Sequence, residues 1–143
     1  MSDANPMPVQ KTQNNQQKTI RVGNDIVSVE RMATSIQKES FVNKVFHPTE
    51  IQYCKSKSHP AASFAARFAA KEAFFKALGT GLYTQGMGPQ DVWIENESHG
   101  RPVLHLSSDA EALLKTLGQE PQWDISLSHD AQMALATVVI QFR

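Results

Sequence analysis

Residues 64–81 constrain the fold more than any other segment, because they predict a helix with hardly any face suited to water. At 3.6 residues per turn, one side of this helix is a stripe of large apolar groups and the other is a smooth surface of alanines. The stripe consists of Phe64, Phe68, Phe75 and Leu78. The sequence therefore predicts a long, largely buried helix, with Pro60 in its first turn and Gly79 at a left-handed C-terminal end.

Charged side chains interrupt this buried helix: Arg67, Lys71, Glu72 and Lys76. A buried charge without a partner costs on the order of several kcal/mol, so each requires a counter-charge, a metal or a ligand. Arg67 and Lys71 are four residues apart and would repel one another unless an anionic group lay beside them. Three cations and one carboxylate suggest a phosphate site with a metal, although Glu72 and Lys76 also have the spacing of an ordinary helix-surface ion pair.

The size and charge of the chain narrow its class. Its 143 residues fit one domain at 19–143, preceded by a polar leader at 1–18 that we expect to be disordered. A net charge of zero argues against a nucleic-acid binder, and no apolar run reaches the roughly 20 residues that span a bilayer. We expect a cytoplasmic protein with no membrane or nucleic-acid partner, in which the single cysteine, Cys54, is an ordinary thiol.

The order of the expected elements favours an α+β fold, because strands and helices do not alternate regularly. Gly23 interrupts the first strand and suggests close approach of another backbone. A helix opens at Pro48, and Ser108 and Glu111 form a capping box for a helix that ends at Gly118. The other expected elements are strands at 20–29, 91–95, 102–106, 123–129 and 133–140, a helix at 30–40 and a glycine-rich loop at 79–88.

Two more polar groups stand in apolar strand patterns, Asp25 and His129. Carboxylates from separate elements, such as Asp25 and Glu72, suit Mg²⁺, and lysines with a histidine would neutralise charge on a transferred phosphoryl group. Asp25 could equally be a turn residue, and His129 a structural histidine. No Walker loop or dinucleotide-binding glycine fingerprint is present. The residues indicate a Mg²⁺-dependent enzyme or binder acting on a phosphate compound, without identifying the compound.

Four motifs in order resemble the holo-acyl-carrier-protein synthases, the small class of 4′-phosphopantetheinyl transferases. They are residues 23–27 with Glu30 and Arg31, residues 67–74, residues 76–81, and residues 126–129. The resemblance covers about residues 19–141 and is most specific in the central helix. It implies a compact α+β fold in which an antiparallel sheet packs on a long buried helix.

The resemblance further implies transfer of 4′-phosphopantetheine from coenzyme A to a serine of apo-acyl carrier protein in fatty acid biosynthesis. The second product would be adenosine 3′,5′-bisphosphate. Asp25 and Glu72 would hold Mg²⁺ and, with Lys76 and His129, form the catalytic set. The implied coenzyme A contacts are Arg67, Lys71, Lys76, Gly79, Thr80, Gly81 and His129. The family usually forms a trimer with active sites between subunits, which would cover a helix that one small protomer leaves exposed.

The segment after the first motif would receive the acidic carrier protein. Its candidate docking residues are Arg31, Lys38, Phe41 and Lys44. Asn24 stands where the family commonly has an apolar residue, and Glu39 dilutes the positive charge of the docking segment. Three alternatives stay open: a catalytically silent coenzyme A-binding module, a structural subunit whose charged helix only makes ion pairs, and a transferase for a secondary-metabolite carrier.

Overall fold

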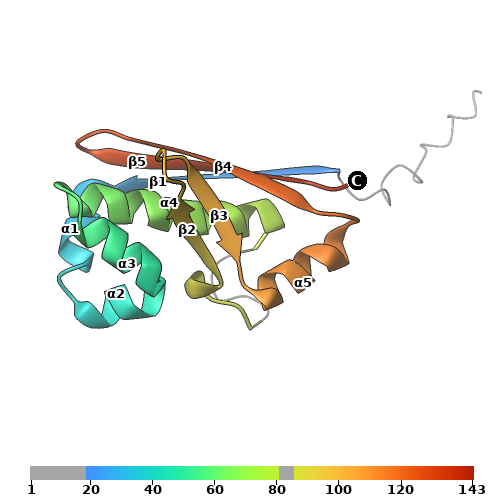
Figure 1. The fold of residues 1–143 in the computed structure, drawn as a ribbon, viewed down its shortest axis with the longest axis horizontal. Helices are drawn as coiled ribbons and strands as arrows, with labels where there is room; N and C mark the ends of the chain where they lie inside the picture. Colours follow the sequence, from blue (N-terminus) through green and yellow to red (C-terminus); the bar gives the residue numbers. More distant parts are fainter. Residues whose placement is uncertain (1–18, 81–85) are drawn as a thin grey trace, which may run out of the picture.

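The computed structural model describes residues 19–80 and 86–143; the expected leader at 1–18 and Gly81 lie outside these ranges. Five strands and five α-helices follow one another as shown in Figure 1. They are β1 (Ile20–Ser28), α1 (Val29–Ser35), α2 (Glu39–Val45), α3 (Pro48–Lys55), α4 (Pro60–Leu78), β2 (Val92–Asn96), β3 (Pro102–Leu106), α5 (Ser108–Leu117), β4 (Gln122–His129) and β5 (Met133–Gln141), with a 3₁₀ turn at Pro89–Asp91 before β2.

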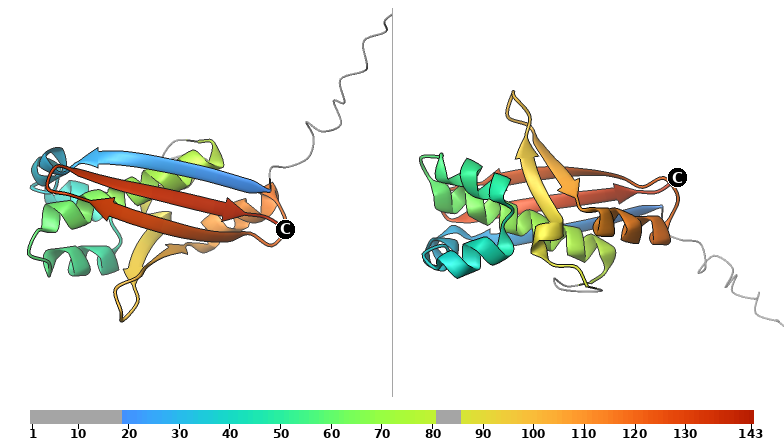
Figure 2. Two further views of the ribbon diagram at one scale, coloured as in Figure 1. Left: turned by 90° about the horizontal axis from the view of Figure 1, so that it is seen from above. Right: turned by 60° about the horizontal axis from the view of Figure 1, so that its bottom comes forward.

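An antiparallel three-stranded sheet, ordered β1-β5-β4, forms one layer, and α4 packs along one of its faces (Figures 1 and 2). The two-stranded hairpin β2–β3 lies on the other side of α4, and α1 to α3 cover the N-terminal half of that helix. Alternate residues of each strand face α4, because side chains of a strand point to opposite faces. The expected α+β fold with an antiparallel sheet on a long central helix is confirmed.

The central helix α4 is enclosed from several directions, which explains its composition. Thirteen of its 19 residues are buried, and most of them are alanine or phenylalanine. Its end follows the expectation: Gly79 adopts φ 83° and donates its backbone N–H to the carbonyl of Lys76. Within the described ranges, we find no helix with the length and apolar character needed to cross a membrane.

Gly23 allows β1 to touch α4 at backbone distance, as its place in the strand pattern predicted. A Cβ atom at this position would lie 1.9 Å from the carbonyl oxygen of Ala73 and 2.6 Å from the nitrogen of Ala77. Gly23→Ala therefore forces β1 away from α4, and we expect it to lower the free energy of unfolding by about 1–3 kcal/mol. Thermal denaturation would measure this loss.

The control for that substitution is Ser98→Ala, at an exposed position of the turn between β2 and β3. We expect the melting temperature of this control to stay close to that of the wild type. Equal melting temperatures for Gly23→Ala and Ser98→Ala would contradict the close packing of β1 on α4.

Two expected helix boundaries are wrong. The helix expected at 30–40 is two helices, because Ser28 accepts the N–H of Arg31 to begin α1 and the chain turns at 36–38 before α2 starts. The N-cap of α5 is Ser107 rather than Ser108: its Oγ accepts the N–H of Ala110 and donates to the carboxylate of Asp91. The tertiary contact with Asp91 selects between two adjacent serines.

Candidate active site

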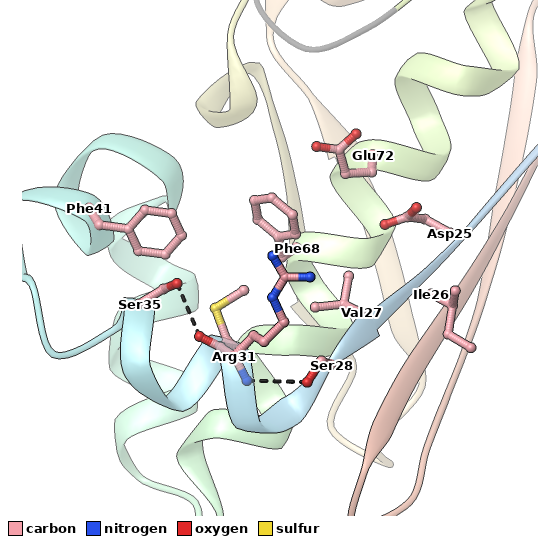
Figure 3. Close-up of a pocket in the computed structure, with 10 residues that line it drawn as sticks. Asp25, Ile26, Val27, Ser28, Arg31, Ser35, Phe41, Phe68 and Glu72 are labelled. Carbon is pink, nitrogen blue, oxygen red and sulfur yellow. Dashed lines mark hydrogen bonds between the residues drawn. The ribbon is translucent and has the colours of Figure 1, made fainter.

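An open pocket of about 390 Å³ lies between β1, α1 and α4 (Figure 3). Asp25 enters it from β1 and Glu72 from α4, and both carboxylates point toward the same space. Arg31 reaches in from α1, below the ring of Phe68, and Phe41 completes an apolar wall. The pocket therefore combines two acids, one guanidinium and two aromatic rings.

The strand and helix periods explain why these two acids meet. Asp25 lies two residues beyond Gly23, so it shares the face of β1 that packs on α4. Glu72 is about 100° around α4 from the buried Lys71, which turns its carboxylate out of the core toward β1 and α1. The structure thus places Asp25 and Glu72 in one pocket, and their catalytic role stays a prediction.

Lys76 joins this group through an ion pair with Asp25. Its Nζ lies 2.8 Å from Oδ1 of Asp25, and the side chains are 53% and 16% exposed. The hydrogen bond to Asp25 raises the pKa of Lys76. The alternative of a simple surface pair between Glu72 and Lys76 is therefore not the arrangement observed, since Lys76 pairs with Asp25 on another element.

Glu72 has no cationic partner at hydrogen-bond distance among the described residues. Its pKa is raised above the ordinary value of 4.5, first by burial and then by the negative charge of Asp25, while Lys76 opposes the shift. Two carboxylates that line one pocket form a good oxygen donor set for a hard divalent cation.

The donor set fits Mg²⁺ rather than a closed metal cage. No cluster of three or more His, Cys, Asp or Glu side chains exists in the described part of the chain. Mg²⁺ usually takes one or two carboxylates and completes its shell with waters and substrate phosphates. Asp25 and Glu72 are the residues that would hold it.

Lys71 does not face the pocket, contrary to the expectation that it contacts a phosphate. Its side chain is 0% exposed, and its Nζ lies 2.6 Å from the carboxylate of the equally buried Glu50. It also donates to the carbonyls of Pro89 and Val92, at 2.9 and 2.5 Å. All three donors of the ammonium are satisfied inside the protein, so Lys71 is a structural cation that ties α4 to α3 and β2.

Glu50 is the residue that sequence reasoning missed. Its carboxylate also accepts the backbone N–H groups of His47 and Ile94, both at 3.0 Å. The signal was present, because an acid three residues after His47 and two after Pro48 is the pattern of a helix N-terminus. That pattern explains the contact with His47 and gives no indication of the contact with Lys71.

Arg67 is also enclosed, at 4% exposed. It donates to the carbonyl of Ser63 and to Oδ1 of Asn96, and its guanidinium lies 4.2 Å from the ring centroid of Tyr53. Its Nε is buried without a hydrogen-bond partner in the described structure. These contacts place Arg67 beside the β2–β3 hairpin rather than in the carboxylate pocket, and its role toward coenzyme A stays a prediction.

His129 and the glycine segment lie apart from the two carboxylates within one protomer. His129 ends β4 and lines a second cavity, of about 570 Å³, with its neighbour Asp130 and with His59 and Pro60 at the start of α4. Gly79 and Thr80 follow the opposite end of α4. The structure therefore brings together Asp25, Glu72 and Lys76 and leaves His129 at a separate surface.

The predicted docking residues gather around α1 and α2. Arg31 and Phe41 line the carboxylate pocket, whereas Lys38 and Lys44 are exposed at the two ends of α2. Phe68, expected in the core stripe, is only half-buried and lies 6.4 Å from Phe41, centroid to centroid. It adds apolar surface to the pocket that sequence reasoning did not assign there.

Cys54 is not a candidate nucleophile. Its thiol is buried, and burial raises its pKa to about 12. The expectation of an ordinary, unreactive thiol agrees with this environment.

This fold, with paired carboxylates on β1 and the central helix, defines a class of transferase. Residues 21–138 match the model of the 4′-phosphopantetheinyl transferase superfamily, and the chain belongs to that superfamily. A holo-[acyl-carrier-protein] synthase of Geobacter sp. (strain M21) is 43% identical over 121 residues, which are 83% of this chain and 95% of that protein. A second, of Protochlamydia amoebophila, is 42% identical over 123 residues, covering 85% and 97% of the two chains.

Solved structures agree with the sequence relatives. The holo-[acyl-carrier-protein] synthase of Neisseria meningitidis superposes with a TM-score of 0.75 at 28% identity, covering 85% of this chain and 97% of that one. The Helicobacter pylori enzyme, solved in complex with coenzyme A, gives a TM-score of 0.72 at 32% identity, with coverage of 84% and 99%. The resemblance to the holo-acyl-carrier-protein synthases is confirmed.

Proposed function

We propose that this protein transfers 4′-phosphopantetheine from coenzyme A to a serine of apo-acyl carrier protein, with Mg²⁺, and releases adenosine 3′,5′-bisphosphate. The observation that carries this proposal is the pocket that both Asp25 and Glu72 line, with Lys76 paired to Asp25. We further propose that the reaction belongs to fatty acid biosynthesis and takes place in the cytoplasm. Coenzyme A bound to the Helicobacter pylori relative supports the choice of donor.

Asp25, Glu72 and Lys76 would have different roles in the reaction. Asp25 and Glu72 would hold Mg²⁺, which when bound supplies positive charge against the pyrophosphate. The half-exposed ammonium of Lys76 is placed to neutralise charge on the equatorial oxygens of the transferred phosphoryl group. The carrier serine hydroxyl would attack the phosphorus that bears the pantetheine arm and displace adenosine 3′,5′-bisphosphate in line, and a carboxylate of the pocket would accept the proton of the hydroxyl.

The carrier would dock on α1 and α2. Arg31 and Lys38 offer positive charge to an acidic protein, and Phe41 with Phe68 offers an apolar surface directly beside the carboxylates. A carrier docked on this surface would place its serine close to the metal held by Asp25 and Glu72. This arrangement favours a transferase over a silent coenzyme A-binding module.

We propose a homotrimer, supported by the outer face of the sheet. No described element covers this face (Figures 1 and 2), and it exposes large apolar side chains. Val22 is 58% exposed and Ile26 60% exposed on β1, next to Leu135 and Val139 at 43% and 38% on β5. Such a patch is typical of a protein–protein interface. In an assembly of this kind, His129 of one protomer would complete the site of another.

Val139→Glu tests this assembly. A carboxylate in the middle of the apolar face would be buried without a partner, so we expect the protein to sediment as a monomer. Analytical ultracentrifugation measures the mass. The control Ala112→Glu adds the same charge at an exposed position of α5 and should leave the assembly intact. A wild type that sediments as a monomer, or an unchanged trimer of Val139→Glu, would contradict the proposed interface.

The intact mass of apo-acyl carrier protein after incubation with this protein, coenzyme A and Mg²⁺ tests the reaction itself. A gain of roughly 340 Da, abolished by a chelator, is the expected result for one phosphopantetheine group. Binding of coenzyme A without a gain on several carriers would indicate the silent module. A mass gain only on a secondary-metabolite carrier would contradict the assignment to fatty acid biosynthesis. If the protein does not bind coenzyme A at all, the alternative of a structural subunit would be favoured.

A further inference from the structure

The face of β1 that packs on α4 carries a third residue in register with Gly23 and Asp25. Arg21 lies two residues before Gly23, and its Nη1 donates to the backbone carbonyl of Leu78 at 3.1 Å. Asp25 contacts Lys76, Gly23 touches Ala73 and Ala77, and Arg21 holds the last residue of the helix. One strand thus fixes the C-terminal half of α4 at three successive points.

The contact of Arg21 adds a hydrogen bond to the C-terminal cap of α4. The last four carbonyls of a helix have no partner within the helix. The backbone N–H of Gly79 donates to Lys76, and that of Thr80 donates to Phe75. Arg21 supplies a donor for the carbonyl of Leu78, directly before the Gly79–Thr80 segment.

The end of a helix is also electrostatically unsuited to a phosphate. Its free carbonyls are equivalent to roughly half a negative charge, which repels anions. Arg21 forms no ion pair with a carboxylate in the described part of the structure, so its full positive charge is available at this end. Its Nε is buried and has no partner among the described residues.

We infer that Arg21 is a positioning residue for coenzyme A. By binding the carbonyl of Leu78 it holds the end of α4 and offsets the negative charge there, so that a phosphate of coenzyme A can lie beside the turn at Gly79 and Thr80. This inference rests on the proposed function, because it needs coenzyme A as the ligand. It assigns to β1 a second role in addition to carrying Asp25.

Three variants test the inference. Arg21→Met keeps the aliphatic stem and removes both the charge and the donor, whereas Arg21→Lys keeps a charge and a donor. Lys115→Met removes one charge from an exposed position in the last turn of α5 and serves as the control. Binding of coenzyme A by calorimetry, at low and high salt, and steady-state KM and kcat are measured for each.

We expect Arg21→Met to raise the Kd and KM for coenzyme A about fivefold to tenfold at low salt, with a smaller effect at high salt. Arg21→Lys should stay within about twofold of the wild type, and kcat at saturating coenzyme A should change little in either variant. A Kd of Arg21→Met equal to that of Lys115→Met would overturn the inference. Equal losses of affinity and of melting temperature in both Arg21 variants would also overturn it, because they would indicate a purely structural contact.

Amide hydrogen exchange separates failure of this inference from failure of the proposed function. The N–H groups of Gly79 and Thr80 should exchange faster in Arg21→Met than in Arg21→Lys, with no coenzyme A present. If the wild type does not bind coenzyme A, the proposed function fails and the role of Arg21 toward that ligand fails with it. Exchange rates that are equal in both variants would overturn the positioning of the helix end even if coenzyme A binds.

Discussion

Glu72→Gln is expected to lower kcat/KM for phosphopantetheine transfer by about 100-fold or more, with the fold intact. The amide that replaces the carboxylate removes one of the two anionic oxygen donors from the pocket. A metal site contributes several kcal/mol of charge stabilisation, and each 1.36 kcal/mol corresponds to a factor of ten in rate. The rate is measured by carrier modification over a Mg²⁺ titration.

The same substitution should slightly stabilise the metal-free protein at neutral pH. Burial and Asp25 raise the pKa of Glu72 above 4.5, so the fold favours its neutral form. The stability that protonated Glu72 gives is present below pH 4.5 and is lost as the pH rises through its raised pKa in the folded protein. The neutral amide of Glu72→Gln does not ionise, so the variant should not lose this stability as the pH rises. Thermal melts of the wild type and the variant, with a chelator at acidic and neutral pH, measure the difference in melting temperature.

Glu120→Gln is the control for both effects. Its carboxylate is 66% exposed and paired with the exposed Arg143, so its removal should change neither rate nor stability appreciably. Unchanged Mg²⁺-dependent turnover of Glu72→Gln would refute the metal role. A lower melting temperature of metal-free Glu72→Gln at neutral pH would contradict the unfavourable environment of this carboxylate.

Glu50→Gln is expected to cost about 3–5 kcal/mol of folding free energy, the largest loss of stability that we expect from a single substitution. The substitution leaves the ammonium of Lys71 fully buried without its counter-charge, although the carbonyls of Pro89 and Val92 still accept its protons. Denaturant unfolding at pH 7 measures the loss. The control Lys115→Met removes a charge from an exposed position and should be nearly neutral.

The pH dependence of Glu50→Gln provides an independent check. Burial lowers the pKa of Lys71, and Glu50 opposes that shift, so the variant should have a still lower pKa at Lys71. The unfolded chain then binds more protons than the folded protein, and the variant should regain stability as the pH rises toward 10.5.

A double variant decides between an ion pair and a simple loss of packing. Combining Glu50→Gln with Lys71→Met removes the unpaired charge, so it should cost less than Glu50→Gln alone. A cost of Glu50→Gln below about 1 kcal/mol, or a double variant worse than the sum of both single changes, would contradict the proposed energetics of this pair.

The features that the sequence predicted correctly depend on local rules. The start of α4 at Pro60, its left-handed end at Gly79 and the close approach at Gly23 each follow from the backbone properties of one residue. The prediction that Asp25 and Glu72 share a pocket used a strand pattern for the first residue and a helix pattern for the second. The family resemblance indicated that these two elements lie together.

The features that sequence reasoning did not predict depend on which groups lie opposite one another. The helix pattern required a partner for every buried charge and could not distinguish a ligand from a protein carboxylate 21 residues away, as between Lys71 and Glu50. In the same way, the alternating strand that ends at His129 gave no indication that this side chain lies on a cavity apart from Asp25.

The sequence by itself therefore determined the buried helix, the class of fold and the need to neutralise the charges that this helix buries. Periodicity and the cost of an unpaired charge are properties of a short segment and can be read without coordinates. Only the tertiary structure decided which charge meets which partner, because that depends on the packing of α3, β1 and β2 around α4. It turned Lys71 inward to Glu50 and left Glu72 and Lys76 beside Asp25, where phosphate chemistry is possible.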